Sequence, residues 1–423
     1  MANEKKDPGS GFSKHFLWGA SVSAHQVEGG NHNQWSVWEL ENARSLAAQA
    51  EYHIGEYGSW ERIEEQAKDP RNYVSGLASD HYNRYKTDFD FLDQMNMNAF
   101  RFSIEWSRIE PQEGVWNAEA IEYYREYLKE LKRRDIEPLV TLFHFTLPVW
   151  FAQKGGFEKR ANIKYFTRFV DKIIAELGQD MRRIITINEP EVYASISYVM
   201  QMWPPAQRSL WKAWRVFNNL ATAHNRSAKR IHKVNRKFKV SVAKQSIYVY
   251  AGDNSWLSRL TAHILQYVED DYFLNRVKKQ CDFLAINYYQ SARVFGYRVH
   301  NPETPLNDLN WVMAPRDIEL VLERIYEKYK LPIIVSENGV ADSEDKHRGW
   351  WLRETLSGMQ AAMKRGVDLQ GYIHWSLLDN FEWSYGHWPK FGLVEVDAKT
   401  FKRTLRPSAV WFGKVIKRLR DTK

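Results

Sequence analysis

Two glutamates stand at the ends of two predicted β-strands that lie far apart in the chain. One is Glu189, in Asn188-Glu189-Pro190, and the other is Glu337, in Ser336-Glu337-Asn338-Gly339. Two carboxyl groups that share a pocket can differ in charge, so that one holds a proton while the other stays ionised. Cleavage of a glycosidic bond needs such a pair: an acid protonates the departing oxygen, and a carboxylate attacks or supports the cationic sugar carbon. The alternative is that both are ordinary surface glutamates beside turns.

Eight short apolar runs alternate with longer amphipathic segments. Most of the runs are nearly continuous in Val, Ile, Leu and aromatic residues, which is typical of parallel strands covered on both faces. The segments between them keep the 3.6-residue period of helices. Strand–helix alternation repeated eight times predicts an α/β fold, a single (β/α)8 TIM barrel with its active site at the C-terminal ends of the strands. The predicted strands are His15–Ser21, Asn98–Trp106, Glu137–Phe145, Arg182–Pro190, Phe238–Ser246, Cys281–Tyr289, Pro332–Gly339 and Leu369–Leu377.

The domain organisation follows from this alternation, which no linker interrupts. We expect residues 1–12 to form a flexible N-terminal tail and residues 13–423 to form one catalytic domain. The polar stretch from Glu41 to Ser79 departs from the strand–helix rhythm. We therefore predict an extended loop after the first strand, with a helix in its Ala-rich part as the alternative.

Composition excludes several classes of function. With 44% hydrophobic residues among 423, the chain can build a large core, but no apolar run approaches the roughly 18 residues of a membrane span. The first residues carry no apolar stretch behind their lysines, and the lone Cys281 fits a reducing compartment, so we expect a cytoplasmic protein without a membrane partner. The net charge of +8 is spread along the helices, which favours a solvated surface over nucleic-acid binding. No Gly-rich phosphate loop or His/Cys cluster indicates a metal or another cofactor.

Further polar and aromatic residues gather at the predicted C-terminal ends of the strands. Each has a structural alternative, since His144 could be a core histidine, Arg101 the partner of a surface ion pair and Tyr289 a core residue. Independent accidents would scatter over both ends of the barrel, so their position at one rim favours a common site. The 18 tryptophans allow the flat apolar faces that sugar sites use, although they can equally fill a core. The residues at the rim are Gln26, Glu28, Arg101, His144, Asn188, Glu189, Asn287, Tyr289, Glu337, Trp375, Glu382 and Trp383.

At these residues the chain resembles the retaining β-glycosidases of glycoside hydrolase family 1, the β-glucosidase and β-galactosidase family. The resemblance runs essentially from end to end. Its most specific elements are Thr186-Ile187-Asn188-Glu189-Pro190, Ile334-Val335-Ser336-Glu337-Asn338-Gly339 and Trp375-Ser376-Leu377-Leu378-Asp379-Asn380-Phe381-Glu382-Trp383. Supporting elements are Gln26-Val27-Glu28-Gly29, the segment from Arg101 to Arg108, and Asn287-Tyr288-Tyr289.

The resemblance implies roles for the rim residues other than Glu28. Glu337 would be the nucleophile and Glu189 the acid/base. The pKa of Glu189 would be raised by burial and by the negative Glu337, and would fall once Glu337 is esterified. Residues that would support the nucleophile are Arg101, Tyr289 and Asn287. Residues that would bind the sugar are Gln26, His144, Asn188, Trp375, Glu382 and Trp383.

The expected activity is that of a retaining, exo-acting β-glycosidase on small β-glycosides or oligosaccharides, most nearly a β-glucosidase. A transglycosylase with the same residues and a non-catalytic carbohydrate-binding barrel remain alternatives. Thioglucosidases of the family carry Gln at the acid/base position, so Glu189 argues against them. The phospho-glycosidases replace the residue at the Glu382 position, and an anionic Glu382 would repel a 6-phosphate.

The chain also departs from the family pattern. Phe145 stands where Trp is common, and Glu191 stands where an apolar or amide residue is usual. The segment from Ile247 to Gln280 is shorter than most relatives provide. A trimmed connection would either open the cleft or leave an apolar surface that a partner subunit covers, so a homo-oligomer stays open.

Overall fold

The barrel strands close on themselves in one parallel sheet. The computed structural model describes residues 11–301 and 305–421. The strand order is β1-β11-β10-β7-β5-β4-β3-β2, with β1 pairing both β2 and β11. The sequence prediction of a (β/α)8 barrel is therefore confirmed. The strands are β1 (Leu17–Ser21), β2 (Ala99–Ser103), β3 (Glu137–Thr141), β4 (Arg183–Asn188), β5 (Lys239–Gln245), β7 (Leu284–Tyr288), β10 (Ile333–Asn338) and β11 (Leu369–Trp375).

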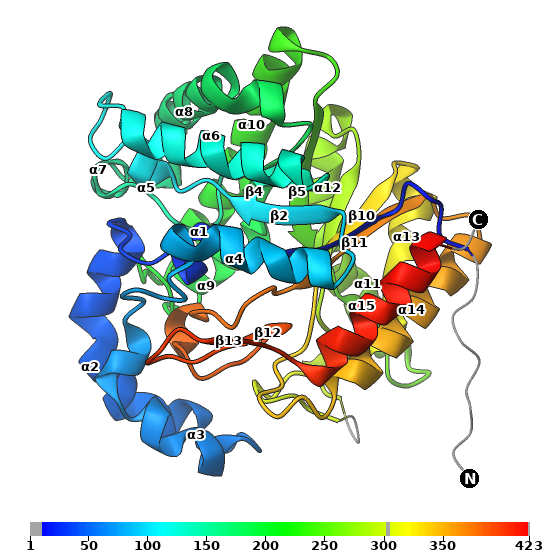
Figure 1. Ribbon diagram of the computed structural model, residues 1–423. Helices are drawn as coiled ribbons and strands as arrows, with labels where there is room; N and C mark the ends of the chain where they lie inside the picture. The colour runs from blue at the N-terminus through cyan, green and yellow to red at the C-terminus, as the bar shows by residue number, and fades with distance from the viewer. Residues whose placement is uncertain (1–10, 302–304, 422–423) are drawn as a thin grey trace.

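Helices surround the barrel, and Figure 1 shows α6, α8 and α10 along one side and α13, α14 and α15 along another. Their apolar stripes pack on the outer faces of the strands, which explains why the strands are apolar on both sides. The helices are α1 (Ala24–Val27), α2 (Gln34–Ile54), α3 (Trp60–Ala67), α4 (His81–Gln94), α5 (Trp106–Ile109), α6 (Ala118–Arg133), α7 (Val149–Gln153), α8 (Ile163–Leu177), α9 (Pro190–Tyr198), α10 (Leu210–Val234), α11 (Trp256–Gln266), α12 (Tyr272–Val277), α13 (Ile318–Tyr329), α14 (Arg348–Lys364) and α15 (Pro407–Asp421).

The interior of the barrel is filled with apolar side chains. The cluster takes residues from all eight strands or from positions beside them, so the barrel is a packed core and not a pore. On β2 the buried Ala99 belongs to this cluster and Arg101 follows two positions later. Buried polar side chains therefore occur on the strands just beyond the apolar core, towards the C-terminal ends. The cluster comprises Leu17, Ala99, Leu139, Ile185, Ala243, Phe283, Ala285, Ile334 and Ile373.

The stretch from Glu41 to Ser79 is mostly helical, so the prediction of an extended loop is wrong there. Helix α2 runs through it to Ile54, and α3 and a 3-10 turn (Pro70–Tyr73) follow. The alternative for the Ala-rich part was correct, because Ala43 and Ala47 lie within α2. Both pack with Tyr73 in one small buried cluster. Small residues at helical spacing make a buried face that carries little hydrophobic signal, so the polar residues around them dominate the pattern.

The chain after β5 and the chain after β7 together form a small three-stranded sheet. Strand β6 (Tyr248–Ala251) pairs with β8 (Ser291–Phe295), which pairs with β9 (Arg298–Val299). Helix α11 then continues through a π-helical segment, Tyr267–Asp271, directly into α12. A separate two-stranded sheet consists of β12 (Val394–Val396) and β13 (Arg403–Leu405).

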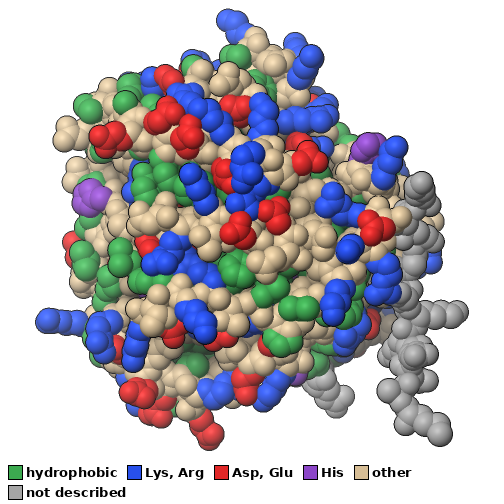
Figure 2. All heavy atoms as spheres, in the orientation of Figure 1, with side chains coloured by type: hydrophobic (Ala, Val, Ile, Leu, Met, Phe, Trp, Pro, Cys, Tyr) green, Lys and Arg blue, Asp and Glu red, His purple; other side chains and the backbone are tan. Residues whose placement is uncertain are grey.

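The surface mixes charges of both signs, as Figure 2 shows for one face. No helix in the ranges 11–301 and 305–421 is long and apolar enough to cross a membrane. Within the same residues, no three His, Cys, Asp or Glu side chains are grouped so that they could hold a metal ion. Of the predicted tail, Gly11 and Phe12 are described, and the Phe12 ring packs against Phe16 at 4.7 Å between centroids; residues 1–10 lie outside the described part.

The first prediction concerns Gly339, where β10 approaches β11. A Cβ atom at this position would lie 1.8 Å from the carbonyl oxygen of Trp375, so the two strand ends would have to separate. We expect Gly339→Ala to lower the free energy of unfolding by about 1–3 kcal/mol, as overpacking does. The matched control is Gly349→Ala in α14, where nothing lies closer than 4.0 Å. Equal thermal unfolding midpoints for the two variants would contradict the prediction.

Candidate active site

A buried guanidinium and a carboxylate meet inside the mouth of the barrel. Arg101, on β2, donates from Nη1 to Glu337 Oε1 and from Nη2 to Asn188 Oδ1 at 2.6 Å. The other carboxylate oxygen, Glu337 Oε2, accepts the hydroxyl of Tyr289 at 2.7 Å. Each oxygen of Glu337 thus has a donor, and one of the two donors is a cation. This arrangement favours the ionised carboxylate.

Glu189 lies at the junction of β4 and α9. It adopts a left-handed conformation with φ of 39°, and Pro190 occupies the first position of the helix. Asn287 Nδ2 donates to Glu189 Oε1 at 2.7 Å and to Asn188 Oδ1 at 3.2 Å. Burial, followed by the charges of Glu337 and Glu191, raises the pKa of Glu189 well above its usual value, against the opposing hydrogen bond from Asn287. The surroundings of Glu189 therefore favour its protonated form, whereas Glu337 accepts hydrogen bonds from a cation and a hydroxyl.

A cavity of about 330 Å³ opens over these two carboxyl groups. Among its lining residues are Gln26, His144, Asn188, Glu189, Tyr289, Glu337, Trp375, Glu382 and Trp383. Cavities of about 1120 and 690 Å³ open elsewhere, lined by residues such as His15 and Arg183 at the N-terminal ends of the strands, and contain none of the predicted site residues. In barrels of this kind the chemistry belongs to the C-terminal face, where the smaller cavity lies.

Aromatic rings form one wall of this cavity. The His144 ring stacks on Trp375 at 5.9 Å and on Trp383 at 6.3 Å between centroids, with interplanar angles of 18° and 16°. Burial, then the charge of Arg101, lowers the pKa of His144 well below its usual value, so this imidazole is neutral. Among the described residues, no hydrogen-bond partner reaches its buried Nδ1. A hydroxyl of a bound ligand can supply that partner.

A third carboxyl group completes the cavity. Gln26 Nε2 donates to Glu382 Oε2 at 3.3 Å, to the Phe381 carbonyl at 2.9 Å and to Asn380 Oδ1 at 3.2 Å. Burial and the charge of Glu337 raise the pKa of Glu382 to about 8, against the hydrogen bond from Gln26. Near neutral pH this carboxyl group is mostly protonated, so it can donate one hydrogen bond and accept others.

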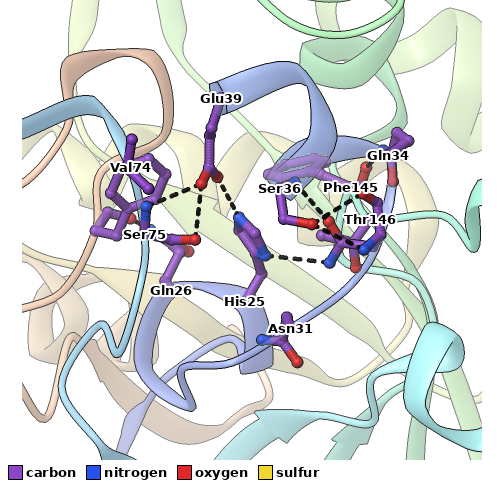
Figure 3. Close-up of polar contacts among 12 residues, drawn as sticks. His25, Gln26, Asn31, Gln34, Ser36, Glu39, Val74, Ser75, Phe145 and Thr146 are labelled. Carbon is purple, nitrogen blue, oxygen red and sulfur yellow. Dashed lines mark hydrogen bonds and ion pairs between the residues drawn. The ribbon is translucent and has the colours of Figure 1, made fainter. Parts of the chain in front are cut away.

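A polar network that the sequence analysis missed lies beside Trp383, since His25 stacks on Trp383 at 5.6 Å between centroids. His25 Nε2 lies 2.6 Å from Glu39 Oε1, and Figure 3 draws this contact. Glu39 Oε2 accepts the backbone N–H and the hydroxyl of Ser75, at 2.8 and 2.7 Å. Although burial raises the pKa of Glu39, His25 and Ser75 lower it below its usual value. No sequence signal joined Glu39 to the site, because its partners come from other segments.

A buried lysine accounts for the unusual Glu191. Lys244, on β5, is fully buried, and its Nζ lies 3.1 Å from Glu191 Oε1, 3.5 Å from Glu269 and 3.6 Å from Asp270. Burial raises the pKa of Glu191 to about 7, and Lys244 opposes that rise. The sequence singled out Glu191 as a departure but gave no sign of Lys244 as its partner. Through its charge, Glu191 helps to raise the pKa of Glu189.

The fold and the site together define a class of protein. A (β/α)8 barrel that places an ionised and a protonated glutamate in one cavity, beside tryptophan faces and hydroxyl-binding groups, is the arrangement of a barrel glycosidase. The family model of glycosyl hydrolase family 1 matches residues 9–278 and 257–420. The chain belongs to this family, as its motifs had indicated.

The chain is similar to known β-glycosidases over nearly its whole length. The solved β-glycosidase of Pyrococcus horikoshii superposes with a TM-score of 0.85 at 32% identity, over 96% of this chain and 95% of that one. Beta-glucosidase A of Thermotoga maritima is 27% identical over 96% of this chain and 98% of its own length. A 6-phospho-beta-galactosidase of Clostridium acetobutylicum is 26% identical over 96% of both. The protein is an O-glycosyl hydrolase of the β-glucosidase type.

The second prediction is that Glu191 tunes the predicted acid. In Glu191→Gln one negative charge near Glu189 is lost, so the pKa of Glu189 falls and it gives up its proton at lower pH. The alkaline limb of kcat/KM for phenyl β-glucoside should therefore move to lower pH. The amide oxygen can still accept the Gln245 N–H, which Glu191 accepts at 2.8 Å.

The control is Glu327→Gln, which removes an exposed carboxylate near the end of α13, where the chain leads into the start of β10 and not into its C-terminal end. Its pH profile should match that of the unaltered enzyme. An alkaline limb that stays in place, or moves to higher pH, in Glu191→Gln would show that Glu191 does not act on Glu189 through its charge.

Proposed function

We propose that this enzyme is a retaining, exo-acting β-glucosidase that also accepts β-galactosides and β-fucosides, and that it hydrolyses terminal non-reducing sugars by double displacement. The observation that carries the proposal is that two carboxyl groups in one cavity have surroundings that favour different protonation states. Glu337 accepts from Arg101 and Tyr289, whereas the pKa of Glu189 is raised by burial and by Glu337. These are the charge states that a nucleophile and a proton donor need.

The proposed reaction has two steps. Glu337 attacks the anomeric carbon while Glu189 gives its proton to the departing oxygen, so that the glycosidic bond breaks and a glycosyl ester of Glu337 forms. Esterification removes the charge of Glu337, and the pKa of Glu189 falls with it. Glu189 can then take a proton from water, whose oxygen attacks the anomeric carbon and frees Glu337. The released sugar keeps its β configuration.

Several contacts support positions for the sugar. Asn188 is held by Arg101 and Asn287, so its amide is fixed close to both carboxyl groups. A hydrogen bond from Asn188 to the sugar 2-hydroxyl would strengthen in the transition state. We propose that Gln26, His144 and Glu382 read the remaining hydroxyls, since each brings a polar group to the cavity. Trp375 offers its face to the sugar ring, and Trp383 its indole N–H.

The lining of the cavity favours an uncharged sugar. Within the described residues, neither Lys nor Arg lines it, and Arg101 just beneath is bonded to Glu337 and Asn188. A sugar 6-phosphate would find no cation there, so its charge would stay unpaired in the cavity. We therefore propose neutral glycones, unlike the substrate that the name of the Clostridium relative implies.

We further propose that residues 13–423 act as one catalytic domain and that the enzyme works in the cytoplasm. The only cysteine, Cys281, is unpaired and buried. A chain of this size without a disulfide fits a reducing compartment.

The third prediction assigns the two glutamates. Glu337→Ala should abolish nearly all turnover, and azide should restore part of it as an α-glycosyl azide, because the small anion attacks from the vacated side. Glu189→Ala should slow substrates with poor leaving groups by about 10²- to 10⁴-fold and activated aryl glycosides far less. With azide it should yield a β-glycosyl azide.

The anomers are read by proton NMR, which also follows the first product of the unaltered enzyme. That product should be the β-anomer, as expected for carboxyl groups about 5–5.5 Å apart. An initial α-anomer would contradict retention, and reversed azide products would exchange the two roles.

The fourth prediction tests glycone recognition. Glu382→Ala should lower kcat/KM for β-glucosides by about one to two powers of ten, since each buried sugar hydroxyl left without its partner costs roughly 1–3 kcal/mol. β-Fucosides should lose less, because they lack the 6-hydroxyl. Equal losses on fucoside and glucoside would show that Glu382 does not read that hydroxyl. β-Glucoside 6-phosphates should remain poor substrates of the unaltered enzyme.

A further inference from the structure

Helix α11 turns its apolar side chains to solvent. Trp256 is 74% exposed, and Leu260 and Ile264 are also exposed. At about 100° per residue these three positions, with Leu257, Tyr267 and Val268, fall within about a third of the helix circumference. The buried side of α11 carries Ser258, Ala262 and Gln266 instead. This polarity is the reverse of that of an ordinary surface helix.

Hydrogen bonds fix this orientation. Gln266 Oε1 accepts the Val249 N–H at 2.9 Å, and its Nε2 donates to the Ile247 carbonyl at 3.0 Å and to Asp270 at 2.8 Å. Ser258 Oγ accepts the Gly296 N–H at 2.7 Å. Rotation of α11 to bury its apolar side would break these bonds and leave buried polar groups unpaired. The exposed stripe is therefore a fixed feature of the fold.

The first turns of α10 carry a second set of exposed apolar side chains. Trp211 and Trp214 stack at 5.0 Å between centroids, and both are exposed. One turn further along α10, Asn218 Nδ2 donates to the hydroxyl of Tyr272 at 3.1 Å. Helix α10 therefore contacts α12, which continues α11 through the π-helical segment. We call Leu210, Trp211, Trp214, Trp256, Leu260 and Ile264 the α10–α11 patch.

The charges around the patch are mostly positive, and the exposed Asp253 just before α11 is an exception. The segments 208–215 and 256–266 contain Arg208, Lys212, Arg215 and Arg259 and no Asp or Glu. Lys212 pairs with Glu158, but the three arginines form no ion pair in the described part of the chain. Two copies joined symmetrically through the patch would bring like charges towards one another. An anionic surface would pair with them.

We propose that the α10–α11 patch docks the enzyme onto the surface of an anionic lipid membrane, a role beyond the hydrolysis proposed above. Exposed Trp and Leu with flanking Arg are the composition of elements that lie in the membrane interface, and the tryptophans insert at the headgroup level. Such contact needs no spanning helix. The patch begins beside the cavity mouth, where Met200 and Met202 are both exposed and part of the cavity lining, and where Ser209 N–H donates to the Tyr198 carbonyl.

The test is flotation of the full-length protein with vesicles. The protein should bind to vesicles made of equal parts phosphatidylglycerol and phosphatidylcholine. It should bind less strongly to vesicles of phosphatidylcholine alone. Trp256→Ser/Leu260→Ser/Ile264→Ser should lower the partition coefficient about tenfold or more, since each change removes apolar area from the contact. Arg208→Gln/Arg259→Gln should weaken binding only to the anionic vesicles, and added salt should do the same.

The matched control is Leu40→Ser/Val410→Ser, which removes two exposed apolar side chains on α2 and α15. This variant should float like the unaltered protein, and every variant should keep its activity on phenyl β-glucoside, which shows that it is folded. Absence of flotation, or equal loss in patch and control variants, would overturn the proposal. If the unaltered protein instead dimerises in sedimentation equilibrium and the patch variant is monomeric, the patch is an interface between two copies and the proposal fails.

Discussion

The bond between Arg101 and Glu337 is the interaction on which the site depends. It joins β2 to β10, which are separated in the barrel by β1 and β11. A buried ion pair is tolerated only where further hydrogen bonds satisfy both groups. Arg101 accordingly reaches Thr141 Oγ1, the Ser336 carbonyl and Asn188 Oδ1, at 3.2, 3.1 and 2.6 Å. The ends of four strands are thereby held around one guanidinium.

The position of Arg101 also decides which of the three carboxyl groups in the cavity is stabilised as a carboxylate. Arg101 bonds to Glu337 directly, whereas Glu189 and Glu382 are reached by amide donors, Asn287 and Gln26. Burial and the charge of Glu337 raise the pKa of both. The difference between the three carboxyl groups thus follows from which one the guanidinium contacts. Lys244 is buried outside the cavity and forms an ion pair with Glu191, so it balances the negative charge of Glu191 near the site.

Some of this could be predicted from the sequence, because strand periodicity and local motifs are encoded in neighbouring residues. The eight apolar runs predicted the (β/α)8 barrel, and the residues around Glu189 and Glu337 indicated the family. Helix α2 was misjudged because its buried face consists of alanines such as Ala43 and Ala47. Glu39 and Lys244 were missed for another reason. Their partners, His25 and Glu191, come from other parts of the chain, and one sequence carries no sign of such pairings.

The protonated state of Glu382 links substrate affinity to pH. Hydroxyl groups that donate to a carboxyl group favour its ionised form. A ligand whose hydroxyl groups donate to Glu382 would therefore lower the pKa of this carboxyl group from its value of about 8 in the empty cavity. By thermodynamic linkage, the affinity for such a ligand would rise with pH up to that value. Acidification of the surroundings would then weaken its binding.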